Sequence, residues 1–216
     1  MGAAVATPEA WQSSSDDRAP IPGCTRVREV AGIRVYTIDG VDYLSTSSVL
    51  RLSPWGRLDH VPPAALEYGR VRGQYVDEAC RMADDGTLDW EALDPKLRPY
   101  VGAWDRWKGE AGWVTEATEE LVVYSDTRTF GYIDRRGTYG GKLAIIDIKT
   151  SVVITDKDHL QVASYLPLDG SLGLVVQLTK RGVAVEHHVD RAEHLSRFKA
   201  LAAEAHRWIV QQETRG

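Results

Sequence analysis

Residues 143–149 read Leu-Ala-Ile-Ile-Asp-Ile-Lys, and this stretch decides which fold the chain can adopt. A nearly continuous run of branched apolar residues is typical of a strand in the buried centre of a sheet. Because side chains alternate between the two faces of a strand, Asp147 and Lys149 share one face, and Ile146 and Ile148 occupy the other. A buried carboxylate and a buried ammonium are costly unless something pairs with them. The pair therefore lies either at an exposed strand end or in a functional site.

A second carboxylate lies in the preceding apolar run, where residues 131–135 read Gly-Tyr-Ile-Asp-Arg. A short hairpin connection joins the two runs, so Asp134 and Asp147 can lie side by side. Two adjacent carboxylates repel each other unless a cation lies between them, and such oxygen ligands suit Mg²⁺ or Mn²⁺. A lysine beside the metal can hold an attacking water or stabilise charge developing on a phosphate. These residue types together indicate metal-assisted phosphodiester hydrolysis.

Turn and capping residues outside these two runs predict the other elements. Asp39-Gly40 predicts a two-residue hairpin turn, a Ser or Thr cap predicts a short helix after it, and Pro62-Pro63 and Gly86 bracket a long helix. The expected strands are 33–38, 41–44, 113–124, 130–136, 142–150, 172–179 and 183–189, and the expected helices are 45–52, 63–84, 95–110, 156–166 and 191–212. This order predicts an α/β domain with a central mixed β-sheet flanked by helices.

Length and composition are those of one globular domain. The chain has 216 residues, of which 43% are hydrophobic, and no apolar stretch is long enough to cross a bilayer. Residues 1–22 lack a period and predict a disordered tail before a single domain at 23–216. The two cysteines predict free thiols in a reducing cytoplasm. The net charge of −5 disfavours a protein that coats nucleic acid, but it is compatible with a nuclease that has a local basic groove.

Seven residues in three motifs follow one another along the predicted elements. The motifs are Gly-x-x-Asp, then Asp-Ile-Lys-Thr, then Gln-x-x-x-Tyr on a helix, and they comprise Gly131, Asp134, Asp147, Lys149, Thr150, Gln161 and Tyr165. This arrangement resembles the PD-(D/E)XK nuclease superfamily, and most of all its RecB-like branch, which includes phage and recombination exonucleases. The resemblance extends from about residue 43 to about residue 178 and implies a restriction-endonuclease-like core.

The resemblance also implies a role for each matched residue. Asp134 and Asp147 would bind Mg²⁺ or Mn²⁺ together with the carbonyl of Ile148, and Lys149 would position the attacking water. The pair on the helix, Gln161 and Tyr165, would brace the site or touch the DNA backbone.

Two further carboxylate positions follow from the resemblance. The family often has another carboxylate on the first strand of the meander, where Glu119 and Glu120 are both candidates and we favour Glu120. RecB-like members often have a histidine on the first core helix, and this chain has Asp77 at that place. Asp77 is either an additional metal ligand or a solvated helix residue.

The implied activity is that of a DNA exonuclease acting on linear DNA with free ends, in recombination, repair or phage replication. The expected setting is the cytoplasm of a bacterial or phage-infected cell, and the sequence does not specify a helicase or recombinase partner. A structure- or sequence-specific endonuclease and a non-catalytic nucleic-acid-binding module are the alternatives. The residues expected to contact DNA phosphates are Arg70, Arg72, Arg135, Arg136 and Lys180.

The histidines do not suggest a metal site in the sequence. His187 and His188 are adjacent strand residues and should point to opposite faces. The others are scattered, and of these only His159 is expected near the proposed site.

Overall fold

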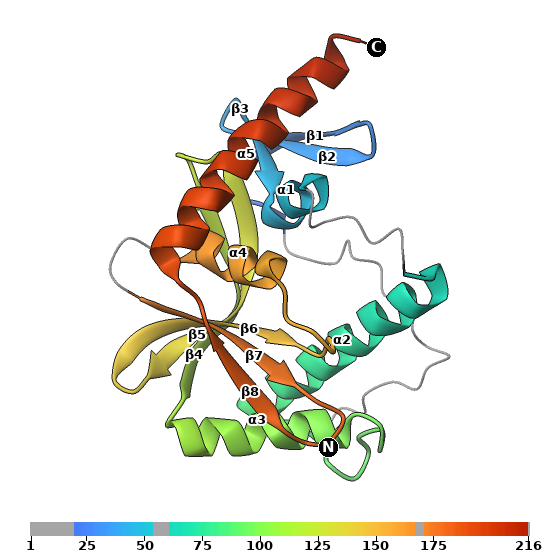
Figure 1. The fold of residues 1–216 in the computed structure, drawn as a ribbon, viewed down its shortest axis with the longest axis vertical. Helices are drawn as coiled ribbons and strands as arrows, with labels where there is room; N and C mark the ends of the chain where they lie inside the picture. Colours follow the sequence, from blue (N-terminus) through green and yellow to red (C-terminus); the bar gives the residue numbers. More distant parts are fainter. Residues whose placement is uncertain (1–19, 54–60, 167–170, 216) are drawn as a thin grey trace.

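A mixed eight-stranded sheet runs through the molecule, with helices on both of its faces (Figure 1). The computed structural model describes residues 20–53, 61–166 and 171–215. The strands are β1 (Cys24–Val30), β2 (Ile33–Ile38), β3 (Val41–Ser45), β4 (Val114–Tyr124), β5 (Thr129–Tyr139), β6 (Lys142–Lys149), β7 (Leu172–Leu178) and β8 (Ala184–His188). The helices are α1 (Thr46–Leu52), α2 (Pro63–Asp84), α3 (Arg98–Ala111), α4 (Asp156–Tyr165) and α5 (Arg191–Glu213). The predicted α/β class with a central mixed sheet is confirmed.

The centre of the sheet is the predicted meander, and it contains a fork. Strands β4, β5 and β6 are antiparallel neighbours, and α4 then crosses over to β7, which runs parallel to β6. Because β4 occupies one edge of β5 along nearly its whole length, β3 and β6 must share the other edge. On that edge β3 pairs with Thr129 and Phe130, and β6 pairs with residues 135–139. The described ladders leave residues 131–134 without a partner there, so the sheet divides at this point.

Alternate side chains of β6, a central strand, pack into two different hydrophobic cores, one on each face of the sheet. Ile146 and Ile148 belong to the core beneath α2 and α3, whereas Ile145 belongs to the core beneath α4. Helix α5 lies across α4, α1 and the hairpin of β1 and β2, in a third core (Figure 1). Because side chains alternate, Asp147 and Lys149 lie on the α4 face of β6.

The turns and helix caps that were predicted from local sequence are present in the structure. Asp39 and Gly40 both have left-handed backbone angles, with φ of 48° and 80°, as a type I′ hairpin turn requires. Ser45 caps α1 through its side chain, which accepts a hydrogen bond from the Ser48 amide. Gly86, with φ of 67°, follows the end of α2.

Three elements differ from the prediction. Strand β1 was not expected, because it ends in an Ala31-Gly32 turn that is not a strong hairpin signal. Helix α3 begins at Arg98 and not at residue 95, because the Asp94 carboxylate accepts a hydrogen bond from the Lys96 amide at 2.8 Å and holds residues 95–97 in a turn. Strand β5 continues through Gly137, where a Cβ would lie 2.1 Å from the Val114 carbonyl, so this glycine permits close approach and does not end the strand.

Most of the predicted N-terminal tail, residues 1–19, lies outside the described residues. Within its last part, the Ile21 carbonyl accepts a hydrogen bond from the Cys24 amide at 3.1 Å. Ile21 also packs against a small core of Ile38, Tyr43 and Phe130. Cys24 and Cys80 are free thiols. Among the described helices, none is both long and apolar enough to cross a membrane.

Candidate active site

The fork in the sheet places Asp134 and Asp147 opposite each other. Arg135 pairs with Ile146 at the last ladder position of β5 and β6, so these two aspartates are the next residues outward. Asp134 Oδ2 accepts a hydrogen bond from the Ile148 amide at 3.2 Å. This bond links the two strands where the ladder has ended, and it holds the Asp134 carboxylate at the branch point.

Asp147 is the most unusual residue of the pair, because its carboxylate is buried without hydrogen bonds. The residue is 1% exposed, and neither of its carboxylate oxygens has a hydrogen-bond partner among the described residues. Lys149 Nζ lies 2.6 Å from Oδ2, so the contact is an ion pair and not an aligned hydrogen bond. Burial raises the pKa of the Asp147 carboxyl, and the Lys149 ammonium offsets part of that rise. Buried carboxylate oxygens with free lone pairs are what a divalent cation needs.

The electrostatics of Asp134 also fit a cation. Burial, and after it the negative charge of Asp147, raises the pKa of Asp134 to about 7. A divalent ion between the two carboxylates would remove both causes, since it would replace lost hydration and cancel their repulsion. The donor set consists of oxygens, as Mg²⁺ and Mn²⁺ prefer. The residues present therefore fit the predicted metal.

Lys149 is held as a charged group beside this pair. Burial acts to lower its pKa, but the carboxylates of Asp147 and Asp134 outweigh burial and keep the pKa above its ordinary value. Its Nζ also donates a hydrogen bond to Gln161 Oε1 at 3.2 Å, which fixes the direction of the side chain. A lysine that remains protonated can donate hydrogen bonds and stabilise negative charge, but it cannot serve as a general base.

Tyr165 packs directly on the part of β5 that has no strand partner on the edge shared by β3 and β6. A Cβ at Gly131 would lie 2.5 Å from Tyr165 Cε1, so only glycine leaves room for this ring. Tyr165 is 5% exposed, and its backbone carbonyl accepts a hydrogen bond from the Tyr124 hydroxyl at 2.6 Å. Burial, followed by the charges of Asp147 and Asp134, raises the pKa of its phenol. Tyr165 thus lies close to the two carboxylates and supports the fork, as does Gln161 through Lys149.

Asp77 reaches the same region from α2, but it is already paired. Its Oδ1 accepts a hydrogen bond from Arg135 Nη1 at 2.7 Å. Burial, and next the charge of Asp134, raises the pKa of Asp77 to about 6, with Arg135 acting in the opposite direction. Asp77 is therefore not a simply solvated residue, and its role as a metal ligand stays a prediction.

The two candidate glutamates on β4 have different environments. Glu120 Oε2 accepts a hydrogen bond from Arg136 Nε at 2.5 Å. Glu119 has a left-handed φ of 51° and interrupts the ladder opposite Asp134, because only its two neighbours pair with β5. The largest influences on the pKa of Asp77 are burial, Asp134 and Arg135. The negative charge of Glu119 is a smaller influence, and it raises that pKa. The structure thus connects Glu119 electrostatically to the carboxylate group around the fork, while the preference for Glu120 remains untested.

The expectation that Arg135 contacts DNA is wrong. Its side chain is completely buried on the α2 side of the sheet, where it forms ion pairs with Asp77 and Asp84. Alternation along β5 turns it away from the neighbouring Asp134. The other predicted phosphate contacts are nearer the surface, although Arg136 is paired with Glu116 and Glu120. Arg70 is paired with Glu67, and Arg72 donates to the Thr150 carbonyl at 2.9 Å.

The histidines are less scattered than the sequence suggested. Asp156, His159 and His194 bring one ligand atom each to within 4.8 Å of the others. Their positions depend on how α4 packs against α5, so sequence spacing carries no sign of this group.

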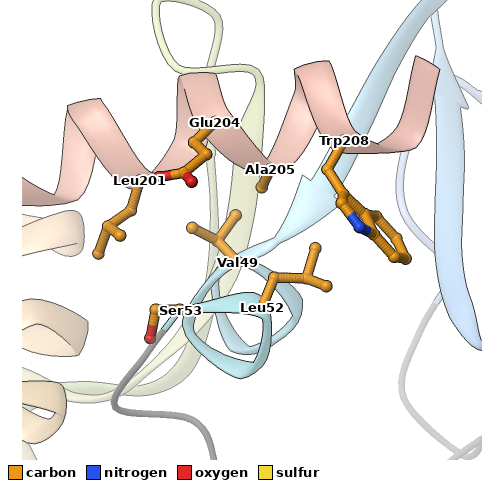
Figure 2. A pocket seen from close by; sticks show the side chains of 7 residues that line it. All are labelled: Val49, Leu52, Ser53, Leu201, Glu204, Ala205 and Trp208. Atoms are coloured by element: carbon orange, nitrogen blue, oxygen red, sulfur yellow. The ribbon is translucent and has the colours of Figure 1, made fainter. Parts of the chain in front are cut away.

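A separate apolar pocket plays no part in this site. It is a cavity of about 80 Å³ between α1 and α5, and Figure 2 shows the side chains around it. None of the predicted site residues lines it; the lining residues are Val49, Leu52, Ser53, Leu201, Glu204, Ala205 and Trp208.

Comparisons with solved structures give remote similarities. No family model and no curated protein matches this sequence. One similar solved structure is an alkaline exonuclease, LHK-Exo, from Laribacter hongkongensis, with 16% identity and a TM-score of 0.41, covering 80% of this chain and 92% of that one. Another is that of SSO0001, with 20% identity and a TM-score of 0.32, covering 62% of this chain and 68% of that one. These likenesses are too distant to assign an activity, so the residues themselves must do so.

Proposed function

We propose that this protein is a metal-dependent nuclease that hydrolyses phosphodiester bonds in DNA. The observation that carries the proposal is the Asp147 carboxylate, which is 1% exposed and has no hydrogen-bond partner for either oxygen among the described residues. A buried carboxylate whose oxygens lack hydrogen bonds is costly to a fold even when an ammonium lies beside it, so its presence needs a functional reason. A second carboxylate, Asp134, lies opposite it at a break in the sheet, and a protonated lysine lies 2.6 Å away.

Each residue has a distinct part in the proposed reaction. Asp134, Asp147 and the carbonyl of Ile148 would hold Mg²⁺ or Mn²⁺, which when bound supplies Lewis-acid activation and a low pKa for bound water. Lys149 donates hydrogen bonds to the attacking water or to a phosphate oxygen, and its positive charge stabilises the charge that develops there. Gln161 orients Lys149, and Tyr165 holds the fork open by occupying the space above Gly131.

Within this activity we favour an exonuclease that acts on linear DNA. The order of Gly131, Asp134, Asp147, Lys149, Gln161 and Tyr165 supports this choice through its resemblance to RecB-like exonucleases. An endonuclease on the same fold is the second candidate, and a binding module without catalysis is the third.

The test uses end-labelled linear DNA and covalently closed circular DNA of the same sequence, each with Mg²⁺, Mn²⁺ or EDTA. We expect the linear DNA to be degraded with either metal and the circles to be spared. Rapid linearisation of the circles would instead establish the endonuclease. Binding of metal and DNA without cleavage of either substrate would establish the binding module.

Matched variants test the site itself. Asp147→Asn should abolish cleavage, while Asp126→Asn should not, since the Asp126 side chain is 58% exposed and paired with Lys199. Lys149→Ala should lower kcat more than metal affinity because a water-positioning group acts mainly on the transition state. Lys142→Ala is its control, since Lys142 is an exposed lysine on the same strand. Full activity in folded Asp147→Asn protein would refute the site.

A further inference from the structure

A second group of ligating side chains lies where the first turns of α4 and α5 meet. Asp156 and His159 are three residues apart on α4 and so project from one helix face, and His194 faces them from α5. One ligand atom of each lies within 4.8 Å of the others. We propose that these three residues form a binding site for a transition-metal ion of the Zn²⁺ class, separate from the Asp134–Asp147 site.

His194 is already oriented as a metal-binding histidine would be. The residue is 8% exposed, and its Nδ1 lies 2.7 Å from the backbone carbonyl of Asp190. Because a carbonyl can only accept, the hydrogen bond places the proton on Nδ1 and leaves a lone pair on Nε2. A backbone carbonyl bonded to the distal ring nitrogen is the usual support for a ligating imidazole.

His159 supplies a nitrogen that lacks a partner. Its Nε2 is buried and has no hydrogen bond to any residue that the structure describes. The centre of its ring lies 5.2 Å from that of His194 and 6.3 Å from that of His187. A bound cation would satisfy the buried nitrogen.

Asp156 completes the group, although Arg197 Nη2 now lies 2.7 Å from its Oδ2. The side chains of this pair are 48% and 30% exposed, and exposed ion pairs are weak enough to rearrange when a stronger ligand competes. The carboxylate also has a second oxygen. Ligands placed 2.0–2.2 Å from a tetrahedral Zn²⁺ lie roughly 3.3 Å apart, so the ligand atoms must approach one another by at most about 1.5 Å.

The donor set distinguishes this site from the one at the fork. Two imidazoles and one carboxylate suit Zn²⁺, whereas Mg²⁺ requires oxygen ligands in nearly ideal octahedral geometry. Three protein ligands leave one position for water. The bound ion would tie α4, which carries Gln161 and Tyr165, to α5, and it would therefore fix the helix that braces the carboxylate site.

Calorimetric titration with Zn²⁺ tests the proposal, using protein that carries Asp134→Asn and Asp147→Asn so that the other site cannot compete. We expect one equivalent to bind, and we expect His159→Ala or His194→Ala to weaken binding by at least about tenfold, in line with loss of support at metal sites. His188→Ala is the control, because the His188 side chain is 63% exposed. Zn²⁺ affinity unchanged in both variants, or absent from the start, would overturn the proposal.

A spectroscopic measurement keeps the test independent of how well these variants fold. Co²⁺ added to the protein that carries Asp134→Asn and Asp147→Asn, with all its histidines intact, should give the visible absorption of a four- or five-coordinate ion with nitrogen ligands, and Zn²⁺ should displace it. A six-coordinate, oxygen-type spectrum would refute the site. Because neither measurement uses DNA, failure here leaves the proposed nuclease activity untouched, and failure of DNA cleavage leaves this site untouched.

Discussion

Replacing Asp134 with asparagine should stabilise the metal-free protein. The pKa of Asp134 is about 7 in the folded chain, against 3.8 for an unperturbed carboxyl. A tenfold change in proton affinity corresponds to about 1.4 kcal/mol, so the ionised carboxylate costs at most about 4 kcal/mol above pH 7. We expect local relaxation to halve this cost, and asparagine can still accept the hydrogen bond from Ile148. Asp134→Asn should therefore gain about 2 kcal/mol, or roughly 4–8 °C in Tm for a chain of this size.

The sign of the pH dependence follows from the same pKa. Between about pH 4 and pH 7 the folded chain retains a proton that the unfolded chain has released, so the stability contributed by this residue falls as pH rises through that window. Asp134→Asn lacks this dependence, and its advantage at pH 5 should be less than about half of that at pH 8. Urea unfolding in EDTA at both pH values measures the difference, with Asp126→Asn as the control. Loss of stability in EDTA at pH 8 would refute the reasoning.

Two further substitutions probe the support of the site. Arg135→Met should destabilise the protein by about 3–5 kcal/mol in urea unfolding, since Asp77 and Asp84 would lose a completely buried partner. Arg136→Met, whose side chain is 33% exposed, should cost under about 1 kcal/mol, and equal costs would contradict this account. Gly131→Ala should displace Tyr165, lower stability by about 1–3 kcal/mol and reduce kcat/KM. Gly69→Ala is its control and should have none of these effects, because there is open space around Gly69. Full activity in Gly131→Ala protein would show that the position of Tyr165 is unimportant.

The parts of the site that the sequence predicts are those fixed by local rules. Asp134 and Asp147 belong to two strands joined by a short hairpin, so their juxtaposition follows from alternation and a tight connection. The long helix α2 begins and ends where proline and glycine indicate. These features need no knowledge of how distant segments pack.

The features that the sequence could not supply depend on irregularity or on tertiary packing. The choice between Glu119 and Glu120 relies on strict alternation of side chains along the strand. The bulge near Thr115 and the left-handed backbone of Glu119 both interrupt that alternation, so the facing side chain cannot be found by counting residues. The burial of Arg135 requires α2 to dock against the sheet. His159 and His194 lie close together only because α4 packs against α5, and their spacing in the sequence does not indicate this proximity.

The fork also has a consequence for the order in which the protein assembles. Strand β3 is held to β5 by two residue pairs, Leu44 with Thr129 and Ser45 with Phe130, which are far apart in the sequence. Closing so long a loop costs chain entropy, and parallel non-local pairing is slow. By contrast, Asp134 and Asp147 come from a single hairpin that forms from local contacts. We therefore expect the two carboxylates to come together early in folding, in contact with water and free cations. The pairing of β3 with β5 beside them would form later.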